Sequence, residues 1–272
     1  MVVVKIGDGL GNQIYNYVCG YAVAKSSGEE LRLDTSECDN SNYRDYLLDN
    51  FNLDPHERES FPNRTVWQKV YKRLRRNLKY FVIKENSKTY SIYDERVYRK
   101  PIFRSRYLHG YWQNIRYFES CEDDIRRQLK ARYNQPVEVK NLIEKIKNMK
   151  SCAIHFRGQD IAMPDEDYFQ MAVDIMEQER PGCEYYVFTN DIEQAKSRLE
   201  KLGVAYKLVS ELGEFSDIDE FFLISACQNQ IISNSTFSRW AAILNDNPNK
   251  LVIAPTHGEK DYEEYPEEWI KL

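Results

Sequence analysis

The sequence predicts an α/β protein with two domains, each built around a parallel β-sheet. It opens with the pattern of a strand, a glycine loop and a helix, and its second half alternates short apolar runs with helical patterns. Strands that alternate with helices pair in parallel through right-handed crossovers. The length of 272 residues allows two domains of about 130 residues each. We therefore expect a ligand cleft between two such domains.

The first half is expected to begin with a buried strand at residues 2–6, a tight glycine turn at 7–11 and a helix with one apolar face. A second strand at 31–34 ends in a carboxylate. Between residues 40 and 104 the pattern weakens into a polar, tyrosine-rich stretch. Residues 108–113 then form an aromatic turn that could close a sheet or line a sugar site.

Two helices, expected at 121–132 and 137–149, lead into the second half, and we place the domain boundary in this region. The predicted domains are residues 1–145 and 146–272. The strands of the second half are expected at 152–154, 185–189, 205–209, 230–233 and 251–254. Its helices are expected at 167–179, 192–202, 218–227 and 237–244, followed by a tail to Leu272 that is helical or irregular.

Composition excludes several classes of protein. A hydrophobic fraction of 42% with 30% charged residues is typical of a soluble globular protein. The net charge of −5 disfavours nucleic acid as a partner. The six cysteines include no Cys-x-x-Cys pair, which fits neither a zinc site nor a disulfide framework. The apolar run at residues 1–4 is too short for a signal peptide, so we expect a cytoplasmic protein.

Residues 69–84 are strongly basic, with apolar residues interleaved at helical spacing. This pattern predicts a basic amphipathic helix. Such a helix can be a solvated surface element, or it can make peripheral contact with an anionic surface such as the cytoplasmic face of the inner membrane. The sequence leaves both interpretations open.

The second domain is expected to be organised around residues 151–160, which read SCAIHFRGQD. The apolar run delivers His155, Arg157 and Asp160 to the carboxyl end of a buried strand, where open α/β sheets bind their ligands. A guanidinium is a permanently charged planar fork that matches a phosphate. Alternatively, His155 and Arg157 have a structural role and pair with carboxylates at the edge of the sheet.

Two further polar clusters follow predicted strands, namely Asn190 with Asp191, and Asn234 with Ser235 and Thr236. Because the carboxyl ends of parallel strands share one edge, we expect these clusters to converge with Arg157. Hydroxyls and free N–H groups at the start of a helix bind anions, although they can also simply cap the helix. The combination describes a nucleoside diphosphate site, with Asp191 on the base or ribose and with Arg157 and Thr236 on the phosphates.

Four motifs carry a family resemblance. GDGLGNQIYNY, HGYWQ, HFRGQD and SNSTFSRWAAIL resemble the GGLGNQMFQY, DGYFQ, HIRRGD and NSSFSWWAAWL of the bacterial α-1,2-fucosyltransferases of glycosyltransferase family eleven. The motifs occur in the family's order and span nearly the whole chain. The resemblance implies a GT-B fold of two Rossmann-like domains whose parallel sheets face a cleft. It also implies GDP-fucose as donor, no metal or other cofactor, and inversion at the anomeric carbon.

By position, the resemblance places the family's essential first arginine on Arg157 and its nucleotide-side histidine on His155. Where the family usually has a second arginine, this sequence has Gly158. The asparagine of the opening loop falls on Asn12, which is expected to be catalytic together with Arg157 and Asp160. The expected donor-binding residues are His155, Asn190, Asp191, Asn234, Ser235, Thr236, Phe237, Gly9 and Gly11.

The implied reaction moves L-fucose to a hydroxyl of a glycan, such as the 2-OH of galactose in a bacterial surface polysaccharide that can be lipid-linked. Domain 1–145 would then serve the acceptor and domain 146–272 the GDP-sugar. Departure of GDP builds negative charge on the β-phosphate, which Arg157 and the helix end at Ser235 would stabilise. Asp160 and Asp8 are the candidate bases, although either could instead orient Arg157 or cap a turn.

Three alternatives remain open at this point. Asp217 and Asp219 match the Asp-x-Asp of a metal-dependent glycosyltransferase, although acids are also favoured at a helix start. The opening glycines followed by Asp34 resemble the fingerprint of an NAD-dependent Rossmann oxidoreductase, except that Asn12 replaces the third glycine. A non-catalytic nucleotide- or sugar-binding module is the third alternative, and Gly158 is the feature that favours it.

Overall fold

The computed structural model describes residues 1–40, 45–62, 64–85, 92–157, 164, 166–256 and 265–272. The chain divides into two compact units, Met1–Arg132 and Tyr133–Leu272. Each unit contains a parallel sheet with helices on its faces, which confirms the predicted α/β class. The division precedes the boundary expected at 145/146, because helix α5 (Val137–Lys147) packs against α8 (Asp217–Ala226) of the second unit.

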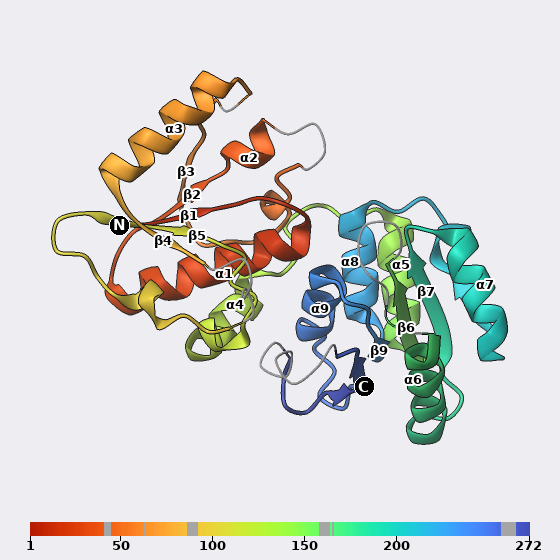
Figure 1. The fold of residues 1–272 in the computed structure, drawn as a ribbon. Coiled ribbons are helices and arrows are strands. Elements are labelled where there is room, and N and C mark those ends of the chain that lie inside the picture. Colours follow the sequence, from red (N-terminus) through yellow and green to blue (C-terminus); the bar gives the residue numbers. More distant parts are fainter. Residues whose placement is uncertain (41–44, 63, 86–91, 158–163, 165, 257–264) are drawn as a thin grey trace. The chain divides into compact units, whose positions relative to one another are not determined.

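The first unit contains a five-stranded parallel sheet in the order β3-β2-β1-β5-β4 (Figure 1). The strands are β1 (Val2–Lys5), β2 (Leu31–Asp34), β3 (Glu57–Glu59), β4 (Tyr80–Lys84) and β5 (Ser105–His109). The helices are α1 (Leu10–Ser27), α2 (Ser36–Asp39), α3 (Val66–Lys79) and α4 (Glu122–Gln128). Short 3-10 helices cover Leu48–Asn50, Glu95–Tyr98, Ile115–Tyr117 and Glu119–Cys121.

Helices α1 and α3 lie on opposite faces of this sheet. Helix α1 packs closely on β1, where a Cβ atom added at Gly20 would come within 2.7 Å of Val4 Cγ1. Helix α3 approaches the other face through polar groups, since Lys72 forms an ion pair with the buried Asp34 at 3.0 Å. The apolar core of the unit therefore lies mainly between the sheet and α1.

The helix predicted at 69–84 is correct only in part. Helix α3 begins after Thr65, whose side chain forms a capping box with Gln68, and it ends at Lys79. The next five residues, Tyr80–Lys84, form strand β4 and pair in parallel with β5. The run Tyr-Phe-Val-Ile has strong β propensity, and pairing with a buried neighbour outweighs the helical spacing of its apolar residues.

The second unit contains a six-stranded parallel sheet in the order β11-β10-β9-β6-β7-β8. The strands are β6 (Ser151–Phe156), β7 (Glu184–Thr189), β8 (Tyr206–Leu208), β9 (Asn229–Ile231), β10 (Val252–Ala254) and β11 (Ile270–Lys271). Its remaining helices are α6 (Glu166–Glu179), α7 (Ile192–Leu202) and α9 (Thr236–Ile243), with a 3-10 turn at Val209–Glu211. Strand β11 lies in the tail that was expected to be helical or irregular, which corrects that prediction.

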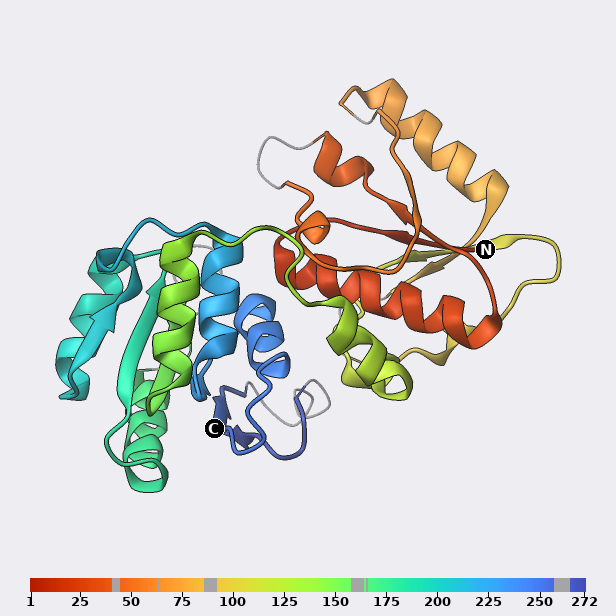
Figure 2. The ribbon, with the colours of Figure 1, turned by 180° about the vertical axis from the view of Figure 1, so that it is seen from behind.

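Two helical layers cover this second sheet (Figure 1, and from behind in Figure 2). Helices α6 and α7 cover one face, and alternate residues of β6 (Cys152, Ile154 and Phe156) point into the apolar core beneath them. Helices α5, α8 and α9 cover the other face, toward which Ala153 and His155 therefore point. Every residue of β6 is buried, as expected for the centre of a parallel sheet covered on both faces.

In each unit the chain first adds strands on one side of a central strand and later adds strands on its other side. In the second sheet the chain runs from β6 to β7 and β8, then returns to β9 beside β6. In the first sheet it runs from β1 to β2 and β3, and later supplies β5 on the other side of β1. Such a reversal leaves a crevice at the carboxyl ends of the two strands, which is where doubly wound sheets bind ligands.

The remaining sequence expectations concern thiols and membrane spans. All six cysteines are free thiols and five of them are buried, in agreement with the expected absence of a disulfide framework. Among the described residues, none of the helices combines the length and the apolarity that crossing a bilayer requires.

Candidate active site

The carboxyl end of β6 brings a histidine and an arginine to the reversal point of the second sheet. His155 is 6% exposed and its ring faces α9, where it lies 5.8 Å from the ring of Phe237, centroid to centroid. Its Nδ1 lies 3.0 Å from the hydroxyl of Ser233, which follows the neighbouring strand β9. Arg157 comes directly after the strand and is partly buried. The two sides of the crevice are thus joined by the contact between His155 and Ser233.

Burial, followed by the charge of Arg157, lowers the pKa of His155 to about 3. The imidazole is therefore neutral at physiological pH. A neutral ring whose Nδ1 is engaged by Ser233 can still offer its other nitrogen to a ligand, as a donor or as an acceptor. His155 is consequently suited to recognising a ligand group, whereas proton transfer near pH 7 requires a different residue.

The amino end of α9 lies at the same crevice. Ser235 is the N-cap, and its hydroxyl accepts a hydrogen bond from the N–H of Phe237 at 3.3 Å. The capping interpretation is therefore correct for Ser235, which is only 2% exposed. The other backbone N–H groups of the first turn, starting at Thr236, have no partner within the helix and point out of its amino end, toward the crevice. The positive end of the helix dipole lies at the same place. This geometry is the one in which helix ends bind phosphate.

The end of β7, next to β6, carries the second predicted cluster. Asn190 is exposed and Asp191 is half-buried. Asp191 is the N-cap of α7, and its Oδ1 accepts from the N–H of Gln194 at 3.1 Å. Capping engages one carboxylate oxygen of Asp191 and fixes the orientation of the group at this edge.

In the first unit, Asn12 and Gln113 meet across the corresponding reversal point. Asn12 lies in the first turn of α1, and its Oδ1 accepts from Nε2 of Gln113 at 2.8 Å. Gly9 caps α1 in an extended conformation, and a Cβ atom added there would meet nothing within 4 Å. Neither the backbone conformation nor the packing of this unit therefore requires glycine at position 9. The absence of a side chain leaves this turn open to a ligand.

Two non-glycine residues at this edge have left-handed backbone conformations, Asp8 with φ 62° and Trp112 with φ 54°. Such values are uncommon for aspartate and rare for a bulky residue, and they concentrate at functional sites. Asp8 also lies close to Tyr111, because its charge is the first cause of the raised pKa of that phenol. The strained residues follow β1 and β5, the two strands that flank the crevice of the first sheet.

Glu85, which the sequence did not indicate, holds this strained loop in place. Its carboxylate accepts from the N–H groups of Tyr111 at 2.5 Å and Trp112 at 3.1 Å. A Cβ atom added at Gly110 would lie 2.4 Å from the Cβ of Glu85, so the loop and the end of β4 fit only with glycine there. Burial raises the pKa of Glu85 to about 7, against the opposing effect of the two N–H donors. Glu85 follows the segment whose strand was predicted as helix, which is why it was missed.

The structure separates the predicted site residues into two groups. The second unit brings together His155, Arg157 and the cluster from Asn234 to Phe237, with Asn190 and Asp191 at the adjacent strand end. Asn12, Gly9 and Gly11 belong to the first unit. Asp160 and Gly158 lie outside the described residues.

Two of the alternative interpretations concern carboxylates that have structural partners. Asp34, the acidic residue of the possible NAD fingerprint, is 1% exposed and pairs with Lys72 while accepting from the hydroxyl of Tyr107 at 2.5 Å. Asp219, the second acid of Asp-x-Asp, forms a capping box with Ser216 at the start of α8 and accepts from Tyr133 at 2.6 Å. These contacts favour structural roles for both residues.

A second residue that the sequence did not indicate is Arg239 on α9. It is 5% exposed. Its guanidinium lies 4.6 Å above the ring of Tyr265, and its Nη2 donates to the Tyr265 hydroxyl at 3.3 Å. It stands where the family motif has a tryptophan, and this departure was the only available signal. Arg239 adds a buried cation to the helix whose amino end faces the crevice.

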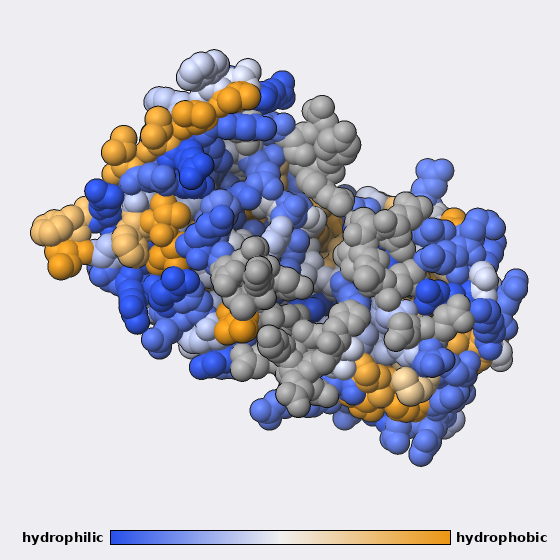
Figure 3. All heavy atoms as spheres, in the orientation of Figure 1, coloured by the Kyte–Doolittle hydropathy of each residue, from blue (hydrophilic) through white to orange (hydrophobic). Residues whose placement is uncertain are grey.

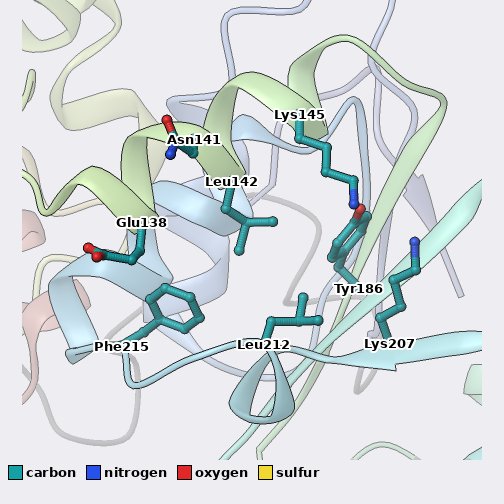
Figure 4. A pocket seen from close by; sticks show the side chains of 8 residues that line it. All are labelled: Glu138, Asn141, Leu142, Lys145, Tyr186, Lys207, Leu212 and Phe215. Carbon is teal, nitrogen blue, oxygen red and sulfur yellow. The ribbon is translucent and has the colours of Figure 1, made fainter.

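A groove of about 330 Å³ lies elsewhere in the second unit, between α5 and the strands β7 and β8 (Figure 4). Leu142, Leu212 and Phe215 point into it, and Lys145 and Lys207 lie near one end beside Tyr186. None of its lining residues is a predicted site residue. We therefore place the candidate site at the strand ends, where the polar groups converge, rather than in this groove.

Two Rossmann-like α/β units with parallel sheets and polar groups at both reversal points form a GT-B-like fold. Residues 53–272 match the model of glycosyl transferase family 11, and the chain belongs to this family. The family predicted from the four motifs is thereby confirmed.

The relatives found by sequence are bacterial glycosyltransferases. The chain is 26% identical to an alpha-1,2-colitosyltransferase of Escherichia coli, over 100% of this chain and 99% of that protein. It is 25% identical to the O-antigen biosynthesis glycosyltransferase WbnK of Escherichia coli, over 92% of each protein. Among solved structures it resembles the fucosyltransferase NodZ from Bradyrhizobium, with a TM-score of 0.53 and 16% identity over 91% of this chain and 96% of NodZ. At this identity the likeness to NodZ supports the fold alone.

Replacing Glu85 by glutamine should change how the stability of the first unit depends on pH. The pKa rises from an ordinary 4.5 to about 7 on folding, so between these values the folded state holds a proton that the unfolded chain loses. Stability of the natural protein therefore falls as pH rises through this window, by about 3 kcal/mol in total. Glutamine does not titrate, so E85Q should not lose this stability. As the pH rises through the window, the difference in free energy of unfolding between E85Q and the natural protein should shift by this amount in favour of E85Q.

Urea denaturation of both proteins at a series of pH values measures this difference. Glu119→Gln, which replaces an exposed carboxylate of the same unit, supplies the baseline. A difference between E85Q and the natural protein that is independent of pH would mean that Glu85 is already ionised in the folded protein below neutral pH.

Proposed function

We propose that this protein transfers L-fucose from GDP-fucose to a glycan hydroxyl, without a metal ion and with inversion at the anomeric carbon. The observation that carries the proposal is the reversal point of the second sheet. There a neutral His155, the guanidinium after β6 and the amino end of α9 occupy one edge. These groups suit the base or ribose and the diphosphate of a nucleotide sugar. Family membership supports a glycosyltransferase over the non-catalytic and NAD-dependent alternatives.

The chemistry follows from where charge develops. The bond between the anomeric carbon and the β-phosphate oxygen breaks, its electron pair stays on GDP, and the sugar ring becomes positive. Arg157 and the first-turn amides of α9 oppose this growing phosphate charge, so they stabilise the transition state more than the bound substrate. The acceptor oxygen attacks from the opposite face and forms the new bond, and its proton passes to a base.

For the base we retain Asp8 and Asp160 as candidates. Asp8 has a strained backbone at the edge of the first sheet and lies beside Tyr111, which supports a functional role for it. Asn12, bonded to Gln113, and the loop held by Glu85 would orient the acceptor at this edge. We propose a sugar of a bacterial surface polysaccharide as acceptor, such as the 2-OH of galactose. The name of the similar O-antigen biosynthesis glycosyltransferase supports this acceptor class.

The donor sugar has two candidates. GDP-fucose is supported by the four motifs. Colitose is raised by the name of the similar colitosyltransferase, and it differs from fucose only in lacking the 3-hydroxyl. A site that hydrogen-bonds a hydroxyl rejects the analogue without it by a large factor, whereas an apolar site discriminates weakly in the opposite direction.

The proposed location is the cytoplasm, where nucleotide sugars are available and free thiols are stable. The six unpaired cysteines are consistent with this compartment. A lipid-linked acceptor would be reached there at the inner face of the membrane.

A donor panel tests the proposed reaction. We expect turnover with GDP-fucose in EDTA, with an acceptor that ends in galactose, and little turnover with any UDP-sugar. Loss of activity in EDTA with recovery in manganese would contradict the metal-independent mechanism. Because a bonded 3-hydroxyl discriminates by about 10⁴, GDP-fucose should exceed GDP-colitose by a large factor. Equal turnover of the two would mean that the 3-hydroxyl is not recognised, and preference for GDP-colitose would identify colitose as the donor sugar.

Replacing Arg157 by lysine tests the role of the guanidinium. Lysine keeps the charge and loses the bidentate fork, and a donor that acts on developing charge is worth about 3–4 kcal/mol, or several hundredfold in rate. We expect the single-turnover rate to fall by this factor while the melting temperature stays within a few degrees. Arg180→Lys, after α6 at the opposite edge of the same sheet, is the matched control. A folded R157K protein with near-normal chemistry would remove Arg157 from the mechanism.

A further inference from the structure

Helix α3 faces the protein with its cationic side. Lys72 pairs with Asp34 at 3.0 Å, and Nη1 of Arg76 lies 3.1 Å from Nδ1 of His109. The guanidinium of Arg75 lies 4.2 Å above the ring of Phe61. These polar and cation–π contacts are what hold the helix on the first unit.

The apolar side of α3 consequently faces outward. None of its residues is buried, although a surface helix normally places its apolar stripe against the core. Figure 3 shows hydrophobic residues gathered in a band along this helix. We call these residues the α3 stripe, and each is at least 43% exposed: Val66, Trp67, Val70, Tyr71, Leu74 and Leu78. Packing among the described residues of the first unit does not account for the stripe.

A neighbouring loop adds a second apolar element. Ile102 is 87% exposed and Phe103 is 94% exposed. Nη1 of Arg104 donates to the carbonyl of Asn77 at 3.3 Å, which connects this loop to the last turns of α3. Large apolar residues at such exposure are costly in water unless a partner covers them.

Cations border both apolar elements. Lys69 and Arg73 are exposed along one side of the α3 stripe, and Lys100 and Arg104 flank the loop pair. Apolar side chains bordered by lysine and arginine, including a tryptophan and a phenylalanine, are the composition of helices that lie in the headgroup region of an anionic bilayer. A symmetric contact between two copies would bring like charges together, which disfavours self-association through this surface.

We propose that the α3 stripe and the loop at Ile102 and Phe103 form a docking surface for an anionic lipid bilayer. The apolar residues enter the interface, and the bordering cations contact the lipid headgroups. This docking is independent of the donor sugar. Its use in reaching a lipid-linked acceptor rests on the function proposed above.

Intrinsic fluorescence and vesicle flotation of the full-length chain test this proposal. Of the four tryptophans, Trp67 is 83% exposed, whereas Trp112, Trp240 and Trp269 are at most 4% exposed. Vesicles of phosphatidylethanolamine with phosphatidylglycerol should therefore shift the emission to shorter wavelength, and Trp67→Phe should abolish this shift. Vesicles of phosphatidylcholine alone should bind much more weakly, and added salt should weaken binding to the anionic vesicles.

The variants separate the apolar and the electrostatic contributions. Leu74→Ser with Leu78→Ser and Phe103→Ser should weaken partitioning at least about tenfold, whereas Met171→Ser, an exposed apolar residue of the second unit, should not. Lys69→Glu with Arg73→Glu should remove the preference for anionic lipid. Lys140→Glu with Lys147→Glu makes the same change of charge on α5 and should leave binding intact.

Turnover of a soluble acceptor, measured in the same preparations, reports catalytic activity separately from membrane binding. The stripe and loop variants should leave this turnover unchanged. Flotation that is indifferent to anionic lipid, or unaffected by the stripe variants, would overturn the docking surface. Burial of Trp67 through a concentration-dependent dimer without vesicles would overturn it as well, in favour of self-association.

Discussion

The arrangement of the candidate site depends on parallel pairing around one fully buried strand. All six residues of β6 are buried, and β7 and β9 flank it with their carboxyl ends at the same edge. Polar residues can follow these strands only where the apolar run ends, so the pairing itself collects groups that are far apart in the sequence. The bond between His155 and Ser233 spans the point where the chain reverses direction. The same burial that fixes the strand keeps His155 neutral, since a charged imidazole would lose its hydration there.

The first unit reaches a similar geometry by different means. Its reversal point is closed by loops under backbone strain, at Asp8 and Trp112, and the buried carboxyl of Glu85 ties down the second of them. Strain of this kind persists only where the surroundings determine the conformation. An ionised Glu85 would accept both N–H groups more strongly but would be costly to bury, and its raised pKa reflects this balance. Glu85 therefore helps to position Gln113 for its hydrogen bond to Asn12, because it holds the two residues before Gln113 in place. The hydrogen bonds of the described residues include none from Glu85 to either side chain.

The sequence was most informative where burial determines the structure. Apart from β11, the strands and helices of the second unit were predicted within a few residues, because their apolar runs are bounded by turn residues and the core accepts only one pattern. In the first unit, β3 consists of Glu57, Arg58 and Glu59 and is a strand only because it pairs with β2. Helix α3 was predicted too long because the apolar spacing continues into β4. Neither edge strand carries a local signal strong enough to show which neighbour it pairs with.

For the site, the motifs located the groups at strand ends, whereas contacts between distant segments could not be inferred. Glu85 and Arg239 act through long-range packing. Apart from the replacement of the motif's tryptophan by Arg239, nothing in their own segments distinguishes them from surface charges. Conversely, the sequence pattern suggested that Asp34 binds a ribose, whereas in the structure it forms an ion pair with Lys72 and accepts a hydrogen bond from Tyr107. A residue's type and position on a strand therefore predicted where it lies better than what it contacts.

The central claim is that the reversal point of the second sheet binds the diphosphate of the donor. A crystal structure of the protein with GDP tests it most directly. The account predicts both phosphates at the amino end of α9, within hydrogen-bond distance of first-turn amides and of the Arg157 guanidinium, with the guanosine toward His155 and Asp191. GDP bound in the groove between α5 and β8, or at the Gly9 turn of the first unit, with the end of α9 unoccupied, would contradict it.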